Sequence, residues 1–486
     1  MPEFRHGINA SVQETVNVPV KVVPAGVIAL IGTVPVHHLA ADNVKVNELV
    51  LIGSDTDARK YGGWMEAGKD YTIPEALSIL YRMRKDYPII MLNVLDRDIH
   101  KTAVVDESVA FDEDGILTLA HTGPMDAVVK HTSGAPTYVK DEDYSVDART
   151  GTITRIETGD ISAEATVKVS YDYVDPTLVE SSDIIGSVDV EGKRTGLQKL
   201  RECYSKLGFN PKHIIVPGFD QSEEVAAEIA SIHADLFSEA YITAPLGTTR
   251  AQMIDGRGAD GTINFNYSQD GLYLCGPHAS VYFPDIEDRK LTPLATIVAG
   301  VAASLCIDGN YAESFSNKDV PLVLDSELDL SFDYTSSTCD ANLLNAAGIV
   351  TMGHDFGRGW FVWGNRGCSF PVSTNPTTMN GASRMGRIWR ETLLRMYATI
   401  IDKKMINFWL NRIVAIGTNL LNEFVSNGNL LGGKVWLDED RNLISELAFG
   451  HLTVSTETTT PPAIEHIQIE HEETIKYLNT LKLGGN

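Results

Sequence analysis

The chain has 486 residues, of which 43% are hydrophobic and 22% are charged, and its formal net charge is −25. This length exceeds what one small core needs, so we expect two or three domains. The negative charge repels phosphate backbones and anionic lipid surfaces, and no lysine- or arginine-rich run offsets it. We therefore expect no nucleic acid partner and no membrane insertion.

The five cysteines are widely spaced and form no CxxC pair. This pattern argues against a disulfide framework or a zinc ribbon and favours a reducing compartment. The N-terminal sequence lacks the apolar core of a secretory signal. We therefore expect a soluble protein made in the cytosol.

The N-terminal segment, residues 1–22, is predicted to be an arm. Pro19 restricts it to an edge strand or an isolated strand, because proline donates no hydrogen bond to a ladder. Four valines alternate with polar residues, which is the period of a strand with one buried face. These are Val16, Val18, Val20 and Val22. So short a segment has no core of its own in which to bury that face.

An α/β unit follows the arm. Residues 25–36 form an apolar run typical of a buried strand. Residues 73–85 have the period of an amphipathic helix with a proline at its start, and residues 88–95 form a second buried strand. The order of strand, helix and strand predicts the beginning of an α/β domain.

Helical periodicity is absent between residues 99 and 177. Short alternating segments with tyrosine, valine and isoleucine are separated there by turns such as Thr150-Gly151. We expect a small all-β domain inserted into the α/β domain. The core domain is then discontinuous, with residues 23–98 and 178–460.

The second half returns to alternating helices and strands. Helices are predicted at about 195–207 and 223–237, each followed by a strand, at 213–216 and 240–243. The apolar run from Pro293 to Ile307 is too short for a comfortable membrane span, so we expect a closely packed core helix. Two long amphipathic helices should follow, at about 385–401 and 406–424, and Asn427-Gly428 should end the second.

The chain ends in a second predicted arm, residues 461–486. Pro461 and Pro462 separate it from the body. Ile467 and Ile469 share one face of an extended strand, and we also assign Ile464 to the apolar residues of the arm. We expect this arm, like the first, to bury its apolar side chains against another chain.

Four patterns imitate ligand sites, and each lacks a required feature. GxGxxG at 256–261 is followed by a strand-like segment, 262–267, instead of a helix. In residues 186–195 the two glycines are one residue farther apart than in a P-loop. Residues 438–442 lack the calcium-loop glycine and read as a charged hairpin turn, and 381–385 lack the second glycine of a nucleophile elbow. We expect no cofactor at any of these places.

The histidines and Cys368 give no convincing site either. His37 and His38 have no further ligand at helical spacing, and His466 and His471 point to opposite faces of an extended chain. Cys368 follows an apolar strand and a turn, but no histidine base is placed beside it. We therefore predict no catalytic residue and no metal, and a protein that is not an enzyme.

Two segments resemble the tail sheath proteins of contractile-tailed bacteriophages. They are DANLLNAAGIVT at 340–351 and GWFVWGNRGC at 359–368. The resemblance continues through the paired helices, Gly433–Leu437, a strand at Leu452–Ser455 and Pro461-Pro462. Upstream it includes Ile184–Gly186 and Phe4–Gly7. It covers most of residues 1–97 and 180–486, and it leaves the β insertion aside.

The resemblance implies an α+β protein with an α/β-type polymerising core and two strand arms. The inserted β domain, which the resemblance leaves aside, is expected on the outside because of its separate β texture and the close approach of its two ends. The WGNR motif, Trp363, Gly364, Asn365 and Arg366, would belong to this fold and carry no catalysis. Trp363 and Cys368 would be core residues. Asn365 and Arg366 would fix the turn after the strand by hydrogen bonds.

The resemblance also implies a function. Such subunits form stacked hexameric rings around a tube, linked by exchanged terminal strands, and contract to drive the tube through the host envelope during genome delivery. The expected partners are other copies of the chain, the tail tube protein, and baseplate and tail terminator proteins. The expected location is the virion, after assembly in the bacterial cytoplasm.

Two alternatives stay open. The same polymerising domain serves tail-derived bacteriocins and type VI-like secretion machines. From a different class, a cytosolic α/β enzyme with a β substrate domain would have the same pattern of elements, but it would stay a small oligomer.

Overall fold

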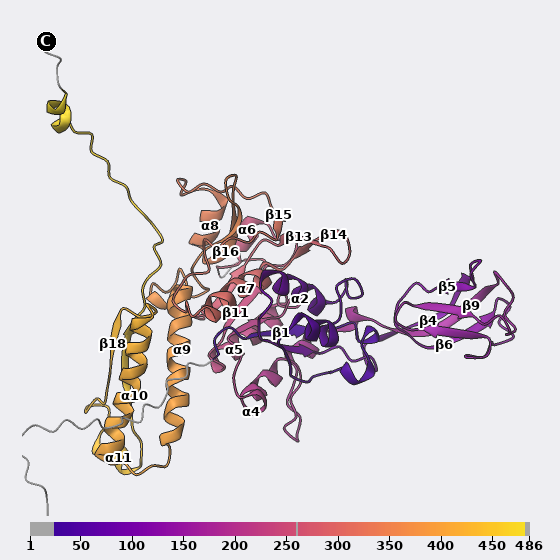
Figure 1. Ribbon diagram of the computed structural model, residues 1–486, viewed down its shortest axis with the longest axis horizontal. Helices are drawn as coiled ribbons and strands as arrows, with labels where there is room; N and C mark the ends of the chain where they lie inside the picture. Colours follow the sequence, from indigo (N-terminus) through magenta and orange to yellow (C-terminus); the bar gives the residue numbers. More distant parts are fainter. Residues whose placement is uncertain (1–23, 259–260, 482–486) are drawn as a thin grey trace, which may run out of the picture.

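The computed structural model describes residues 24–258 and 261–481. Its central element is an eight-stranded sheet with the order β17-β16-β12-β11-β10-β1-β3-β2 (Figure 1). The strands are β1 (Ile28–Gly32), β2 (Val50–Ile52), β3 (Ile89–Asn93), β10 (His213–Ile215), β11 (Glu239–Thr243), β12 (Leu272–Cys275), β16 (Ile349–Asp355) and β17 (Gly359–Trp363). The N-terminal arm, with Val16, Val18, Val20 and Val22, lies outside the described residues.

The middle of this sheet is parallel and buried on both faces. Every residue of β1, β3, β10, β11 and β12 is buried. The sequences of such strands are continuous apolar runs, because helices cover both faces of the sheet. Successive residues of β1 therefore enter different cores, with Ile28 and Leu30 on one side and Ala29 and Ile31 on the other.

Helices on the two faces complete the α/β layers. The first core holds α2 (Thr72–Met83) and α7 (Leu294–Ile307), and the second holds α5 (Glu223–Asp235). The predicted core helix is confirmed as α7, in which 12 of 14 residues are buried. A Cβ on Gly300 would lie 3.0 Å from the Met83 side chain, so its small residues permit close packing with α2. In the part of the chain that the structure describes, no helix is long and apolar enough to cross a membrane.

Shorter elements complete the core domain. They are α1 (Asp55–Asp57), α3 (Ser181–Ile185), α4 (Cys203–Leu207), α6 (Arg250–Asp255), α8 (Asp340–Ala346) and the sheet of β13 (Ala279–Phe283), β14 (Asp288–Thr292) and β15 (Val323–Ser326). The helix predicted at 195–207 is mostly a 3-10 helix, Gly196–Glu202, followed by α4. The strand predicted at 262–267 is absent. The guanidinium of Arg257 instead binds the carbonyl oxygens of Phe265 and Tyr267, which holds the segment away from a ladder.

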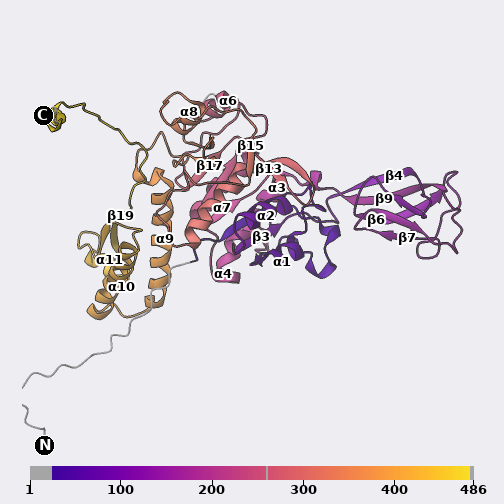
Figure 2. The same cartoon turned by 45° about the horizontal axis from the view of Figure 1, so that its top comes forward.

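A β module stands out at one end of the molecule (Figures 1 and 2). One sheet has the order β4-β9-β6 and the other β5-β8-β7. The strands are β4 (Lys101–Ala110), β5 (Ile116–Thr118), β6 (Pro124–His131), β7 (Tyr144–Asp147), β8 (Thr152–Arg155) and β9 (Thr166–Val174). The module has its own hydrophobic cluster, which includes Val129, Ile153 and Val169. Its first and last strands pair at the base, where Lys101 is opposite Val174.

A helical pair stands at the opposite end (Figure 1). It consists of α9 (Asn380–Tyr397) and α10 (Asn407–Ser426), with β18 (Gly432–Trp436), α11 (Ile444–Ala448) and β19 (Ser455–Thr459) after them. The first helix was predicted to reach Ile401. It ends at Tyr397 because the chain turns through a short 3-10 helix, Ala398–Ile400, and Ile401 is exposed. The prediction that Asn427-Gly428 ends the second helix is confirmed, and Gly428 has a φ of 74°.

The connection between β18 and β19 also differs from the prediction. Residues 438–442 were predicted to be a hairpin turn, but they lead into α11. The strand predicted at 452–455 begins only at Ser455. The side chain of Asn442 explains the shift, because it donates to the Thr453 carbonyl at 2.9 Å and accepts from the Thr453 amide at 2.8 Å. Thr453 is therefore engaged by the loop and is not free to join the ladder.

Candidate assembly site

The place where ligands bind in open parallel sheets is filled by the protein's own side chains. That place is the carboxyl edge where the strand order reverses, here between β1 and β10. Thr33 and Thr72 exchange hydrogen bonds there, from each amide to the other hydroxyl, both at 3.1 Å. On the other side of β1, the side chain of Asn93 at the end of β3 accepts from the Val34 amide, also at 3.1 Å. This arrangement does not favour the enzyme alternative.

The patterns that imitate ligand sites do not have the local structure that such sites require, and those at 381–385 and 438–442 lie in or lead into helices. The GxGxxG segment follows α6 and not a strand, and its residues 259–260 lie outside the description. Within residues 24–258 and 261–481, no group of three or more His, Cys, Asp and Glu residues could hold a metal ion. His37 and His38 lie in a short 3-10 helix, and His466 and His471 lie on the exposed C-terminal arm.

Cys368 is fully buried in the second core. Its amide donates to the Leu272 carbonyl at 2.8 Å, and its own carbonyl accepts from the Arg257 guanidinium. Burial raises the pKa of the Cys368 thiol. A protonated, enclosed thiol is a packing group and a poor nucleophile.

Asp220 is a buried carboxyl group that the sequence analysis did not single out. It follows β10, and one of its oxygens accepts from the Thr243 amide at 2.8 Å. Its other oxygen, Oδ1, has no hydrogen-bond partner. Burial raises the pKa of Asp220 to about 7, against the opposing effect of the Thr243 hydrogen bonds. The neutral acid therefore fits this place better than the carboxylate.

We expect Asp220→Asn to make the protein less sensitive to alkaline pH. Because the folded pKa is raised, the stabilising contribution of Asp220 is complete below its unfolded pKa and is lost as the pH rises through about 7. The free energy of unfolding of Asp220→Asn, relative to wild type, should increase by about 3 kcal/mol between pH 5 and pH 8. Urea denaturation at a series of pH values measures this. A difference that stays constant with pH would contradict the assignment.

The WGNR motif lies where β17 ends and the chain crosses toward α9. Trp363 was expected to be a core residue, but it is only half-buried, because β17 is the edge strand of the sheet. Its ring makes an edge contact with Phe332 at a centroid distance of 5.2 Å. The Asn365 carbonyl accepts from the Asn380 amide at 2.9 Å and from the Asn380 side chain at 3.1 Å. Asn365 therefore ties the motif to the start of α9 through its backbone.

Arg366 reaches beyond the motif to the C-terminal arm. Its Nε and Nη2 atoms donate to the two carboxylate oxygens of Glu465 at 2.9 and 2.5 Å. Its Nη1 donates to the Thr378 hydroxyl at 2.8 Å, and the guanidinium lies over the Phe370 ring. The hydrogen bonds to Glu465 raise the pKa of Arg366. We call Arg366 and Glu465 the arm clamp. Local sequence patterns gave no sign of it, because the partners are 99 residues apart.

Beyond the clamp, the C-terminal arm extends away from the body (Figures 1 and 2). It forms no strand within the described part of the chain. Its three assigned isoleucines are largely exposed, with Ile464 at 81%, Ile467 at 72% and Ile469 at 86%. Exposed isoleucines on an extended segment are typical of a strand that lacks its partner chain.

The sheet of β18 and β19 offers a suitable partner surface. Its two strands are antiparallel, with Gly432 opposite Thr459 and Trp436 opposite Ser455. Val435 is buried and lies close to Gly417 of α10, so the sheet is fixed on the helical pair. Among the described residues the sheet has two strands only, so each strand has an outer edge with unpaired backbone groups. Arms without partners and sheet edges without neighbours are features of a self-assembling subunit.

Comparison with known proteins leads to the same class. A family model for the phage tail sheath protein central domain matches residues 192–368, and a model for a protein family of unknown function matches residues 96–181. The tail sheath protein of Burkholderia phage BcepMu is 38% identical over 488 residues, 99% of each chain. That of Escherichia phage P2 is 28% identical over 308 residues, 63% of this chain and 74% of the relative.

Solved structures share the fold at low sequence identity. The helical sheath of the anti-feeding prophage in the contracted state aligns with a TM-score of 0.55 and 12% identity over 96% of this chain and 99% of that chain. The contracted PVC sheath complex of an extracellular contractile injection system aligns with a TM-score of 0.56 and 10% identity, over 98% and 99%. The predicted mixture of helices and sheets is confirmed.

The chain belongs to the phage tail sheath protein family. Its role is that of a structural subunit of a contractile tail sheath, and it is a component of the virion.

Proposed function

We propose that this chain polymerises around a tail tube and that neighbouring subunits are linked by exchanged terminal strands. The observation that carries the proposal is the coexistence of an extended, apolar C-terminal arm and a two-stranded sheet with unpaired edges. Addition of an extended segment to an open sheet edge is a common mode of chain recognition. The N-terminal arm, with its four alternating valines, is proposed to act in the same way.

The energetics favour this linkage. Each backbone hydrogen bond that an arm gains on a sheet contributes about 1 kcal/mol net. Each isoleucine or valine that it buries adds roughly 1.5–3 kcal/mol at most. Ordering one residue costs about 1–2 kcal/mol, so several hydrogen bonds with two or three buried side chains offset the cost of a short strand.

The two arms leave the body at different places. The C-terminal arm leaves at the clamp, beside the WGNR motif. The N-terminal arm enters the body at Ala25, which belongs to the cluster between the two long helices with Trp389 and Leu420. Because the two arms leave the body at separate places, each arm can link to a different neighbour. A continuous mesh of subunits requires such links.

Contraction is proposed to drive the tube through the host envelope during genome delivery. The extended lattice is then a metastable state, and contraction increases the contact between subunits while the arm links persist. We propose the tail tube, baseplate and tail terminator proteins as further partners and the host cytoplasm as the place of assembly. The tail sheath proteins of Burkholderia phage BcepMu and Escherichia phage P2 are 38% and 28% identical to this chain, which favours a phage sheath over a secretion machine.

Electron microscopy of the purified full-length protein tests polymerisation. We expect hollow tubes with a regular axial repeat. A small closed oligomer under all tested salt and protein concentrations would contradict the proposal that the chain polymerises on its own.

Replacing Cys368 by alanine should leave assembly intact. The thiol fills core volume only, so the expected loss is about 1 kcal/mol in the free energy of unfolding. Denaturation and a tube-pelleting assay measure the two properties separately. A normally stable variant that fails to form tubes would show that Cys368 has a role beyond packing.

Removal of the β module should also leave assembly intact. We propose that it lies on the outside of the sheath, because it has its own core and its ends meet at the pair Lys101 and Val174. Replacing residues 101–174 by a short Gly/Ser linker should still give tubes, of smaller outer diameter. If the variant folds and never polymerises, the module takes part in the lattice contacts.

A further inference from the structure

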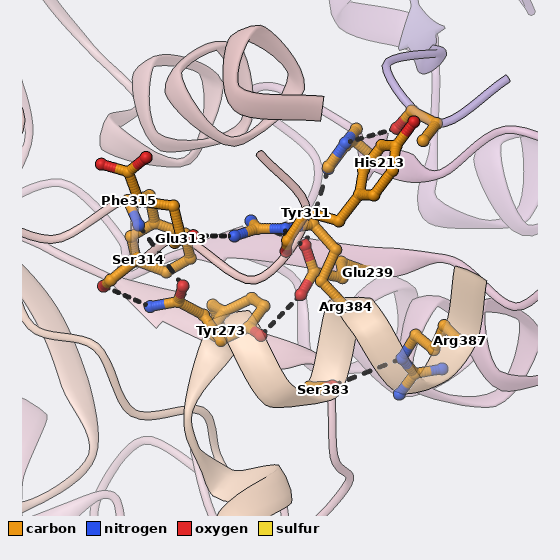
Figure 3. A network of polar contacts seen from close by, with 12 residues as sticks. His213, Glu239, Tyr273, Tyr311, Glu313, Ser314, Phe315, Ser383, Arg384 and Arg387 are labelled. Atoms are coloured by element: carbon orange, nitrogen blue, oxygen red, sulfur yellow. Dashed lines mark hydrogen bonds and ion pairs between the residues drawn. The ribbon is translucent and has the colours of Figure 1, made fainter. Parts of the chain in front are cut away.

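A buried polar network begins at the root of the N-terminal arm (Figure 3). The Nε2 atom of His213 lies 3.2 Å from the carbonyl oxygen of Ala25. Its Nδ1 atom lies 3.1 Å from the Tyr241 hydroxyl, whose oxygen lies 3.1 Å from Glu239 Oε2. Burial, with Arg384 nearby, lowers the pKa of His213 to about 3, so the ring is neutral.

Glu239 and Arg384 form the centre of this network. They are 1% and 2% exposed, and Arg384 Nη1 lies 3.5 Å from Glu239 Oε2 without hydrogen-bond geometry. The Glu239 carboxylate also accepts from the Tyr273 hydroxyl at 2.8 Å. Burial is the largest single influence and lowers the pKa of Arg384, but Glu239 together with Cys306, Tyr241 and Tyr273 raises this pKa above its ordinary value. Arg384 therefore remains charged.

The network continues to the root of the C-terminal arm. Arg384 donates from Nε to the Tyr311 carbonyl at 2.9 Å and from Nη2 to the Glu313 carbonyl. The next residue, Ser314, accepts from the Asn380 side chain at 3.0 Å, and the same side chain holds Asn365. Asn365 directly precedes Arg366 of the arm clamp. Side chains and short backbone segments thus join the roots of both arms.

Stability alone does not account for such a pair. A buried ion pair is often no more stabilising than apolar residues of the same volume, because desolvation offsets the attraction. A chain of linked hydrogen bonds does fix geometry, since each member restricts the next. In a lattice held by arms, the geometry that matters within a subunit is the relative position of the two arm roots.

We propose that Arg384 and Glu239 are positioning residues that hold the N-terminal and C-terminal arm roots at fixed positions relative to each other. The links between neighbouring subunits then have the same geometry throughout the sheath. This inference rests on the proposed strand exchange. It predicts that the pair controls the regularity of the sheath and not the ability to polymerise.

The test is a double variant, Arg384→Met with Glu239→Gln, in the full-length chain. It removes both charges, and glutamine still accepts from the tyrosine hydroxyls. We expect an unfolding midpoint within a few degrees of wild type and an unchanged pelleted fraction, but tubes whose image transforms have lost their sharp layer lines. The matched control is Arg387→Met. Arg387 is also buried on α9, but its contacts are Asp270 and Ser383, so layer lines should persist.

A second variant, Arg384→Lys, covers the case in which the double variant fails to fold. Lysine keeps the charge beside Glu239 but lacks the planar fork that reaches two carbonyls at once, so layer lines should again weaken. Sharp layer lines in a folded variant, or complete loss of pelleting, would overturn the inference and leave strand exchange in place. Wild-type protein that forms no tubes would overturn strand exchange and the inference together.

Discussion

Truncation of the chain before Pro461 should give a folded protein that stays monomeric at concentrations where the full-length chain forms tubes. The body keeps its three main cores, because Ile464, Ile467 and Ile469 are exposed and contribute nothing to them. The truncation removes the proposed link, which consists of several backbone hydrogen bonds and up to three buried isoleucines for each subunit. We expect this loss to weaken assembly more than any single substitution in the core does.

Sedimentation velocity measures this effect, with circular dichroism as the check on folding. Glu472→Gln with Glu473→Gln is the matched control, because it alters the arm outside Ile464, Ile467 and Ile469 and should still assemble. Removal of residues 1–22 should have the same consequence as the C-terminal truncation. Tubes that still form from both truncated chains would mean that the body alone carries the lattice.

Reversal of the arm clamp should raise the concentration needed for assembly by about tenfold. In Arg366→Glu, two carboxylates face each other where a bidentate pair stood at 2.9 and 2.5 Å. The arm then no longer leaves the body in one fixed direction. Its docking onto a neighbour costs more conformational entropy, because the free arm has more conformations to lose. Because the Glu465 side chain is 45% exposed, we assign the clamp only about 1–2 kcal/mol, which corresponds to that change in concentration.

The double reversal, Arg366→Glu with Glu465→Arg, should recover most of the lost assembly. A pelleting assay over a concentration series gives the critical concentration for each variant. Arg201→Glu is the matched control, since Arg201 forms a similar surface pair with Asp235 far from the arm. An equal shift in this control, or no recovery in the double reversal, would contradict a specific role of the clamp.

Local periodicity predicted much of the core. The apolar runs of β1 and β3 and the small residues of α7 are buried in the structure as expected, because burial on both faces leaves a continuous apolar signature. Helix ends were less predictable. Ile400 and Ile401 keep the helical spacing, but the chain turns after Tyr397, so the spacing continues where the helix does not.

The site itself was only partly predictable. The WGNR motif was found through its resemblance to a family, but no periodicity connects Arg366 to Glu465 or Arg384 to Glu239. Such pairs join residues that are far apart in sequence, and a single charged residue gives no local signal of its partner. Thr33 and Thr72 were missed for the same reason. Two ordinary threonines fill the crevice only because α2 begins beside the end of β1.

The central claim is that the C-terminal arm of one subunit joins the sheet of β18 and β19 in another. Interchain disulfide formation tests it most directly, since the five native cysteines are buried. One chain carries Ile467→Cys, and a second carries Lys434→Cys or Glu457→Cys, which lie opposite each other and are exposed. Paired strands bring Cβ atoms within reach of a disulfide. The account predicts cross-linked dimers from tubes of the mixed chains. Well-formed tubes without a cross-link to either strand, and none from Ile464→Cys or Ile469→Cys, would contradict it.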